Sequence, residues 1–401
     1  MILTTTKGQK DLPRYFGPVF DVVCNLRRGR MDFVLEDGRT FRAEGAEPGY
    51  QAVLEVKHPE TFTRLIREGD LGFSEAYLDG WWTTPDLQAF MDFVHDQNDT
   101  VSDNFVGYAL VRAWENLRFW LQSNSKKQAK KNISYHYDLG NDFYRLWLDD
   151  TMTYSSALFK TGQESLEKAQ TQKYEAMVDQ MGVKEGDHVL EIGCGWGGFA
   201  EYAAGTRGLN VTCLTISQEQ YKYAVERIEK AGLSEKVTFK LQDYRDETGR
   251  YDGIASIEMF EAVGEHYWPA YFNAIAQRLK RGGRAVIQTI TIQDELFAGY
   301  RTRSDFIRHY VFPGGMLPSL ARFREEAERA GLKFAGAFGF GKDYARTLRE
   351  WLVRMQAQES AIRALGHDQQ FLRNWEFYLG ICAATFEVAR TDVVQVELVN
   401  A

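Results

Sequence analysis

The sequence predicts an α/β fold with a Rossmann-like parallel sheet, preceded by a small α+β domain. From about Met181 onward, apolar strand-like runs alternate with helical segments, which is typical of a parallel sheet with right-handed crossovers. The first of these strands runs directly into the glycine-rich stretch Val189–Gly198. The N-terminal residues instead switch between helical and strand periods, as expected of a separate domain.

Composition limits the class of protein before any motif is considered. The 401 residues are 44% hydrophobic and 14% aromatic, which suits two domains with large cores. A net charge of −8 argues against a nucleic-acid partner. The chain has no apolar run of about 18 residues and no apolar signal-peptide core. Four scattered cysteines without a CxxC pair indicate a reducing cytoplasm and argue against a structural metal site.

Residues 1–97 are predicted to form the small domain. Alternating apolar residues around Asp37-Gly38 predict a hairpin over Met31–Arg42, since this dipeptide favours a tight turn. The other expected elements are a mostly helical stretch over residues 1–28, a strand over Val53–Val56, helices over Pro59–Glu68 and Asp86–Val94, and between the helices an aromatic segment, Gly69–Trp82.

Residues 98–131 are predicted to be a helical linker with a basic end. Its apolar and aromatic centre leads into four lysines, Lys126, Lys127, Lys130 and Lys131. Such a segment can contact an anionic membrane, where each lysine adds about 1 kcal/mol. The alternative, which these residues alone favour, is a solvated helix end, because lysines are common there.

The main domain is expected over residues 132–401. Strands are predicted at Val189–Ile192, Val211–Thr215, Val237–Leu241, Gly253–Ile257 and Ala285–Ile292, with a last strand at the sheet edge around Val394–Leu398. Helices are predicted at Gly198–Ala204, Gln218–Ala231, Pro269–Leu279, Ser319–Ala330, Tyr344–Ala364 and Asp368–Phe386. Ser217 is expected to cap the second helix, with Gln220 at the capping-box position. The long stretch Asp294–Gly315 is expected to cover the ligand cleft.

The glycine turn after the first strand predicts a nucleotide-like ligand. Its spacing, G-x-G-x-G-G, differs from the dinucleotide fingerprint, and no Lys-Ser/Thr follows for a phosphate loop. Glu191, just before the turn, suits a cationic ligand. Together these features indicate S-adenosylmethionine (SAM), whose sulfonium is a cation and which carries no phosphate. The alternative is a tight turn that only packs a helix on the sheet.

Polar residues follow the next three strands, and the carboxyl ends of parallel strands are where such sheets bind ligands. Thr215 and Gln220 can hold a ribose, and Gln242 with Asp243 can contact an adenine amine, although ordinary polar turns would look the same. Glu258 and Glu261 are followed by apolar and aromatic neighbours, and desolvation there would raise a carboxyl pKa and make a base. The alternative for these glutamates is a helix cap or solvent.

Two upstream segments are rich in aromatic rings and hydroxyl groups, Tyr135–Phe143 and Thr153–Ser156. Ring faces stabilise a cationic ligand or intermediate. Composition alone favours the simpler interpretation that the rings pack in the core and that the hydroxyl and carboxyl groups cap helices.

Taken together, the segments resemble the family of cyclopropane fatty acid synthases and mycolic acid cyclopropane synthases, which are SAM-dependent lipid methyltransferases. The matching motifs are YHYDLGNDFY (135–144), MTYSSA (152–157), VLEIGCGWGGFA (189–200), LTISQEQ (214–220), LQDYRD (241–246), SIEMFEAVG (256–264), QTITI (288–292), YVFPGG (310–315) and FGKDYARTLREW (340–351). Residues 61–82 also resemble the smaller N-terminal domain of phospholipid-acting members. The resemblance implies a class I methyltransferase sheet with helical lid insertions.

The resemblance implies methyl transfer from SAM to the cis double bond of a phospholipid acyl chain. The reaction would pass through a carbocation and give a cyclopropane or a methyl-branched product. The enzyme would then lie on the cytoplasmic face of an anionic membrane; a homodimer is left open. The alternatives are a product that feeds a furan or 10-methyl fatty acid pathway, a soluble small-molecule substrate, and a lipid-binding homologue that has lost catalysis.

The resemblance also implies roles for individual residues. The cofactor would contact Tyr137, Tyr154, Ser155, Gly193, Gly195, Thr215, Gln220, Gln242 and Asp243. Ring-forming members hold a bicarbonate ion that takes up the proton, and three of its ligands correspond to Glu261, the Ile290 backbone and Tyr344. The chain departs at the other two, with Ser156 in place of a cysteine and Gln288 in place of a histidine. Gln288 carries no charge, so a bicarbonate ion would be held less tightly.

Overall fold

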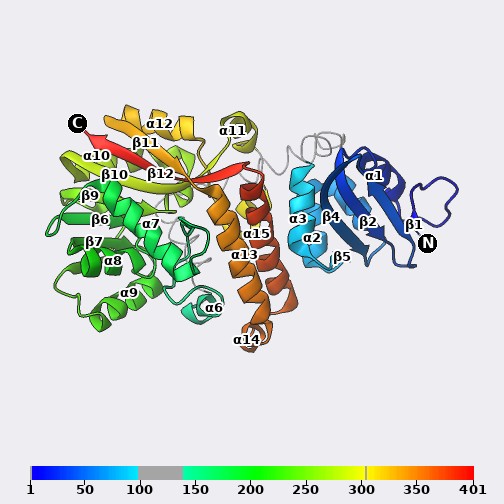
Figure 1. Ribbon diagram of the computed structural model, residues 1–401, viewed down its shortest axis with the longest axis horizontal. Helices are drawn as coiled ribbons and strands as arrows, with labels where there is room; N and C mark the ends of the chain where they lie inside the picture. The colour runs from blue at the N-terminus through cyan, green and yellow to red at the C-terminus, as the bar shows by residue number, and fades with distance from the viewer. Residues whose placement is uncertain (1, 98–138, 303–304) are drawn as a thin grey trace. The chain divides into compact units, whose positions relative to one another are not determined.

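The computed structural model describes residues 2–97, 139–302 and 305–401. These fall into two compact units, coloured along the chain in Figure 1. The described residues of the first unit are 2–97, with Thr302–Val311 and Met355–Val388. Those of the second unit are 139–301, with Phe312–Arg354 and Ala389–Ala401. The expected domain boundaries near residues 97 and 131 border or enter residues that are not described, so they stay predictions.

The first unit is built on a five-stranded sheet in the order β1-β3-β2-β4-β5 within the described residues. Its strands are β1 (Ile2–Leu3), β2 (Arg28–Val34), β3 (Thr40–Glu44), β4 (Glu47–Val56) and β5 (Trp82–Thr83). The predicted hairpin is confirmed, because β2 and β3 pair antiparallel with Phe33 opposite Phe41. The predicted strand at Val53–Val56 is also confirmed as the end of β4.

Among the described residues, five α-helices belong to this unit: α1 (Phe16–Val23), α2 (Thr61–Leu78), α3 (Leu87–Asp96), α14 (Glu359–Ala364) and α15 (Gln369–Glu387). The expectation of helix over most of residues 1–28 is wrong, since α1 covers only eight residues there. α2 continues through the aromatic segment because Gly69 adopts φ 69° and kinks the helix instead of ending it. Phe16 lies at the centre of the core, 5.0 Å from the Phe41 ring and 5.1 Å from the Phe62 ring.

The second unit contains a seven-stranded sheet in the order β11-β12-β10-β9-β6-β7-β8 among its described residues. The strands are β6 (His188–Ile192), β7 (Asn210–Thr215), β8 (Val237–Leu241), β9 (Tyr251–Ile257), β10 (Leu279–Ile292), β11 (Leu332–Gly339) and β12 (Thr391–Asn400). β6 to β10 pair parallel, and β12 runs antiparallel to both β10 and β11. The predicted α/β class is confirmed.

The helices of this unit alternate with the strands (Figure 1). They are α6 (Asn141–Arg145), α7 (Leu166–Met181), α8 (Gly198–Arg207), α9 (Gln218–Lys230), α10 (Trp268–Arg278), α11 (Asp294–Tyr300) and α12 (Leu320–Arg329), and α13 (Gly341–Ala357) leaves the unit after Arg354. Met177 of α7 and Phe199 of α8 pack with Val189, Val211 and Val286 in one apolar core. As predicted, the Ser217 hydroxyl caps α9 by accepting the Gln220 N–H.

Two expectations about the C-terminal part are wrong. The last strand, β12, lies inside the sheet and not at its edge, because the unpredicted β11 pairs with its outer side. β11 contains two glycines, Gly336 and Gly339, and glycine weakens a strand pattern in sequence. The helix expected over Tyr344–Ala364 is two helices, α13 and α14 (Glu359–Ala364), separated at Gln358.

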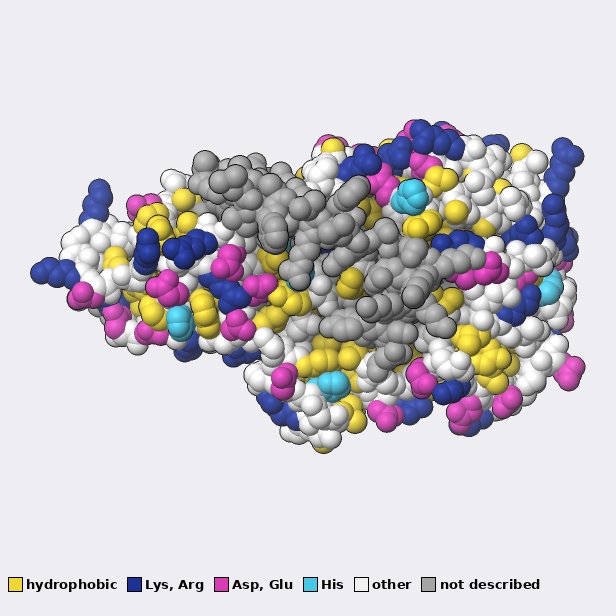
Figure 2. All heavy atoms as spheres, turned by 180° about the vertical axis from the view of Figure 1, so that it is seen from behind, with side chains coloured by type: hydrophobic (Ala, Val, Ile, Leu, Met, Phe, Trp, Pro, Cys, Tyr) yellow, Lys and Arg dark blue, Asp and Glu magenta, His cyan; other side chains and the backbone are white. Residues whose placement is uncertain are grey.

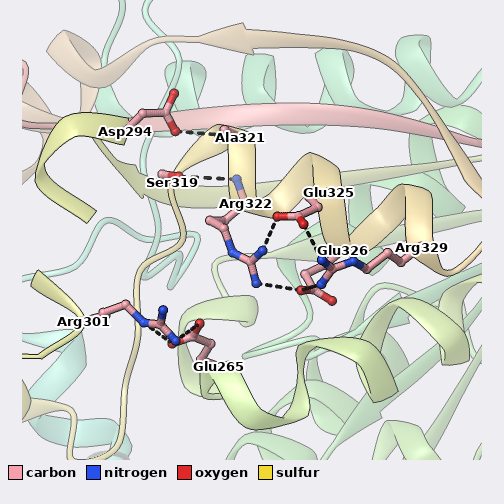
Figure 3. Close-up of polar contacts among 9 residues, drawn as sticks. All are labelled: Glu265, Asp294, Arg301, Ser319, Ala321, Arg322, Glu325, Glu326 and Arg329. Atoms are coloured by element: carbon pink, nitrogen blue, oxygen red, sulfur yellow. Dashed lines mark hydrogen bonds and ion pairs between the residues drawn. The ribbon is translucent and has the colours of Figure 1, made fainter. Parts of the chain in front are cut away.

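The stretch expected as a cover contains α11 and a π-helical turn, Ile307–Val311. Asp294 at the start of α11 accepts the Ala321 N–H of α12 at 3.2 Å, and Arg301 after its end pairs with Glu265 at 2.8 Å (Figure 3). α11 is therefore tied to α12 and to the 3₁₀ turn Glu265–Tyr267, which follows the predicted catalytic segment.

The outer face of α12 carries a small ion-pair network. Arg322 pairs with Glu325 and Glu326, and Arg329 pairs with the same two glutamates (Figure 3). Basic and acidic side chains are interspersed over the described part of the face seen in Figure 2. The Glu325 and Arg329 side chains are exposed, and exposed pairs contribute about 0–1 kcal/mol each, whereas Glu326 is buried. None of the described helices has both the length and the apolarity needed to cross a bilayer.

Candidate active site

The glycine turn lies between β6 and α8, at the carboxyl end of the sheet. Its backbone is left-handed at Gly193 (φ 82°) and Gly195 (φ 49°), a region that favours glycine. A Cβ on Gly193 would lie 2.7 Å from the Met259 side chain. The N–H groups of Gly193 and Cys194 both donate to the Leu214 carbonyl of β7 at 3.0 Å. The turn is thus anchored to the neighbouring strand, and larger residues are excluded at Gly193.

The residues expected to hold ribose and adenine follow β7 and β8. The Thr215 hydroxyl donates to Gln220 Oε1 at 3.2 Å, and the Gln242 N–H donates to the Thr215 carbonyl at 2.9 Å. The structure therefore brings these three residues together. Asp243 is ion-paired with Arg245 at 2.6 Å, a partner that the sequence did not suggest. Its carboxylate is already partly neutralised before any ligand approaches.

Aromatic residues surround Tyr154. The centre of its ring lies 5.6 Å from the rings of Tyr144 and Trp147 and 5.4 Å from that of Trp351. This arrangement suits a cation, because ring faces attract positive charge. Tyr137 and the four lysines of the predicted linker lie outside the described residues.

Glu191 is buried within β6, 2% exposed, and accepts a weak hydrogen bond from Cys213 Sγ at 3.5 Å. Burial raises the pKa of this carboxyl to about 8, so the protonated form predominates at pH 7. The expectation that Glu191 suits a cationic ligand stays a prediction, because a cation bound nearby would itself favour the ionised form of this carboxyl.

Glu258 is the centre of the polar site. It follows β9 with a left-handed backbone, φ 49°, which is strained for a residue other than glycine. Its Oε1 accepts the Ser156 N–H and the Gln288 amide N–H, both at 2.8 Å, and its Oε2 accepts the Tyr344 hydroxyl at 2.5 Å. The sequence marked Glu258 only as a candidate base. Nothing in the local pattern indicated that three donors from distant segments would converge on it.

This convergence bears on the bicarbonate ligands that the family resemblance implied. Ser156, Gln288 and Tyr344 were expected to face an anion, and all three donate to the Glu258 carboxylate instead. The Ser156 hydroxyl itself donates to the Ala157 carbonyl at 2.9 Å, so only the backbone of Ser156 takes part. The donor set present does not fit a free bicarbonate ion, because a side-chain carboxylate already uses it.

Glu261 lies three residues further on, in the 3₁₀ turn Phe260–Ala262, and is bound differently. Its Oε1 accepts the Ile290 N–H at 2.5 Å and the Thr289 hydroxyl at 3.0 Å. Its buried Oε2 has no hydrogen-bond partner among the described residues. Loss of hydration, and then the nearby charge of Glu258, raise the pKa of Glu261 to about 8.

A buried lysine offsets the negative charge of Glu258. Lys173 of α7 donates to the Ser155 hydroxyl and to Gln170 Oε1, each at 2.6 Å. Burial lowers its pKa to about 7, and the charge of Glu258 opposes that shift. Desolvation also raises the pKa of Glu258, while Lys173 and the three donors oppose the rise. Two neighbouring carboxyl groups do not readily ionise together, so the donors favour Glu258 as the charged one.

Comparison with known proteins shows that this chain is similar to lipid-modifying enzymes. Residues 124–396 match the family described as mycolic acid cyclopropane synthetase. The chain is 36% identical over 367 residues to the tuberculostearic acid methyltransferase of Mycobacterium tuberculosis, covering 89% of this chain and 86% of that protein. It is 35% identical over 356 residues to the cyclopropane-fatty-acyl-phospholipid synthase of Escherichia coli, covering 86% and 87%.

A solved structure agrees with these relatives. The mycolic acid cyclopropane synthase complexed with S-adenosylhomocysteine (SAH) and CTAB matches with a TM-score of 0.63 and 30% identity, over 67% of this chain and 97% of that one. The names of the sequence relatives state different products, and the chain is similar to each to nearly the same degree.

Proposed function

The chain belongs to the mycolic acid cyclopropane synthetase family of SAM-dependent methyltransferases, and on that premise we propose that it methylates the cis double bond of an unsaturated phospholipid acyl chain. The observation that carries the proposal is the hydrogen-bonded Glu258 carboxylate beside the glycine turn. Met259, the next residue, lies directly against Gly193. A base is thus adjacent to the place where the cofactor would bind.

The residues at the sheet edge fit SAM. Gly193 and Gly195 leave room for its close approach, and Thr215, Gln220 and Gln242 offer hydroxyl and amide groups to a ribose and a purine. Aromatic rings around Tyr154 suit the positive charge of a sulfonium. When bound, SAM supplies an electrophilic methyl group, which the electron-rich double bond takes up, so that the positive charge passes to the acyl chain.

The protein's own groups would then manage that charge and one proton. Glu258, whose ionised form its three donors and Lys173 favour, would stabilise positive charge on the acyl chain and accept the proton that the chain must lose. Glu261, neutral at pH 7 because its pKa is about 8, adds no competing negative charge. Acid and base roles are divided in this way where two environments push carboxyl pKa values apart.

We favour an open-chain methylated product, either methyl-branched or methylene. All products gain one CH₂ in total, and the position of the base decides which proton leaves. Ring-forming relatives were expected to use bicarbonate, whereas here a carboxylate of the chain uses the same donors. A different acceptor favours the loss of a different proton. The name of the tuberculostearic acid methyltransferase supports this choice, and that of the Escherichia coli relative supports a cyclopropane as the second candidate.

The test is to incubate the purified chain with methyl-deuterated SAM and vesicles of a mono-unsaturated phospholipid. Label in the acyl chain supports the proposal, and a saturated phospholipid is the matched control. Proton NMR of the released fatty acid then separates a cyclopropane from a chain that keeps a C=C bond. No label with any unsaturated lipid, together with normal SAH binding, would show that this chain methylates something else or only binds lipid.

A further inference from the structure

A chain of buried amides connects Glu258 to the opposite side of β10. Gln288 and Gln395 are direct cross-strand partners on β10 and β12, and both are fully buried. Gln395 Nε2 donates to Gln288 Oε1 at 3.1 Å, and Gln288 Nε2 donates to Glu258 Oε1 at 2.8 Å. At the other end, Gln180 Nε2 donates to Gln395 Oε1 at 2.5 Å.

One contact, with the Lys173 carbonyl, fixes which end of each amide donates. A glutamine amide can turn by 180° and exchange its donor and acceptor ends, but a backbone carbonyl can only accept. Gln395 Nε2 donates to the Lys173 carbonyl at 3.3 Å, so its NH₂ end must face that carbonyl. The same NH₂ group then meets Gln288 Oε1, which leaves the NH₂ end of Gln288 facing Glu258.

We propose that Gln395 is a positioning residue for the proposed methyl transfer: anchored on the Lys173 carbonyl, it orients the Gln288 amide as a donor and so keeps Glu258 a carboxylate. If Gln288 turned, its carbonyl oxygen would face Glu258, which would then have to be protonated to donate. The inference rests on the proposed function. It adds Gln395, which lies 107 positions after Gln288 in the sequence.

Other groups also face Glu258, and they set the baseline for any pH effect. Lys173 of α7 stabilises its charge, Tyr344 of α13 donates to it, and Glu261 of the same loop opposes its ionisation. A change at Gln395 removes none of these three side chains, but it takes the Gln395 donor away from the Lys173 carbonyl, and the Gln288→Met background separates that effect from the one carried by Gln288. The hydrogen-bonded relay from Gln395 through Gln288 to Glu258 therefore predicts that the pKa of Glu258 shifts and that Glu258 still titrates.

The test compares Gln395→Met with Gln180→Met. Methyl transfer is measured across pH 5–9, and kcat and KM for the lipid are determined separately. In Gln395→Met the acid limb of the kcat profile should move up by about one pH unit, the size expected from losing a hydrogen bond to a charged group, with KM little changed. Gln180→Met should leave the limb in place, because the Lys173 carbonyl still orients Gln395. In a Gln288→Met background, Gln395→Met should cause no further shift.

A second measurement does not depend on activity. Infrared titration of the protein without substrate follows the protonated carboxyl band that disappears in Glu258→Gln, and this band should persist to higher pH in Gln395→Met. An unchanged band and limb in Gln395→Met, or an equal shift in Gln180→Met, would overturn the relay. Should Gln395→Met not fold, Gln395→Asn keeps the amide but is one methylene shorter, and the same shift is expected. If the wild-type protein transfers no methyl group, the proposed function is wrong, but the infrared band still tests the role of Gln395.

Discussion

The Tyr344 hydroxyl donates to Glu258 Oε2 at 2.5 Å, across 86 positions of the sequence. Tyr344 lies in the first turn of α13 and Glu258 directly after β9. The contact joins a residue expected to bind an anion to a residue that supplies the negative charge itself. It is the third donor on Glu258. The Ser156 donor is a backbone N–H and Gln288 lies in β10, whereas the Tyr344 hydroxyl is a side-chain group on a helix.

Tyr344→Phe removes this donor and keeps the aromatic ring. A hydrogen bond to a charged group contributes about 1.5–3 kcal/mol, so kcat should fall by roughly tenfold or more at pH 7. Because the donor favours the ionised form of Glu258, its loss raises the pKa of that carboxyl, and the acid limb of the pH profile should move to higher pH. Calorimetric SAH affinity should stay within about twofold. A parallel fall in SAH affinity would place Tyr344 in the cofactor site.

Glu258→Gln and Glu261→Gln should differ in size of effect. Removing a general base costs about 10²–10⁴-fold in rate, and Glu258→Gln should show a loss of that order. Glutamine resembles the neutral acid that Glu261 is at pH 7, since its pKa is about 8, so Glu261→Gln should lose less there. Single-turnover transfer of labelled methyl to vesicle lipid measures both. The opposite ranking would make Glu261 the proton acceptor.

Gly193→Ala should weaken cofactor binding by about tenfold or more, because a left-handed φ costs a non-glycine residue about 1–3 kcal/mol. The new Cβ would also lie 2.7 Å from the Met259 side chain. Gly299→Ala is the matched control, since this glycine in α11 has nothing within 4 Å of an added Cβ and no positive φ. SAH titration by calorimetry compares the two. Equal affinities would separate the glycine turn from the cofactor.

Glu191→Gln should change how stability depends on pH. Burial raises the pKa of Glu191 from 4.5 to about 8. Between these values the folded protein keeps a proton that the unfolded chain has lost, so this group lowers the unfolding free energy as pH rises, by about 1.4 kcal/mol per pH unit. Urea unfolding at pH 5, 6, 7 and 8 should show a smaller decline in Glu191→Gln than in wild type. Glu229→Gln, on the exposed side of α9, should keep the wild-type decline.

Several elements followed from local patterns. The five parallel strands β6 to β10 were recognisable because their apolar runs alternate with capped helices, and the hairpin of β2 and β3 followed from its Asp-Gly turn. β11 was not predicted because its two glycines interrupt the strand pattern. The placement of β12 inside the sheet then depended on a neighbour that the sequence did not reveal.

The sequence by itself determined the class of the sheet, the glycine turn and the likeness to SAM-dependent lipid methyltransferases, because each rests on residues close together in the chain. Only the tertiary structure decided what the departures at Ser156 and Gln288 mean. Their donors reach Glu258 from 102 and 30 positions away, and Ser156 uses its backbone while its hydroxyl bonds elsewhere. Hydrogen-bond direction depends on which groups meet in space, and no spacing along a chain encodes it.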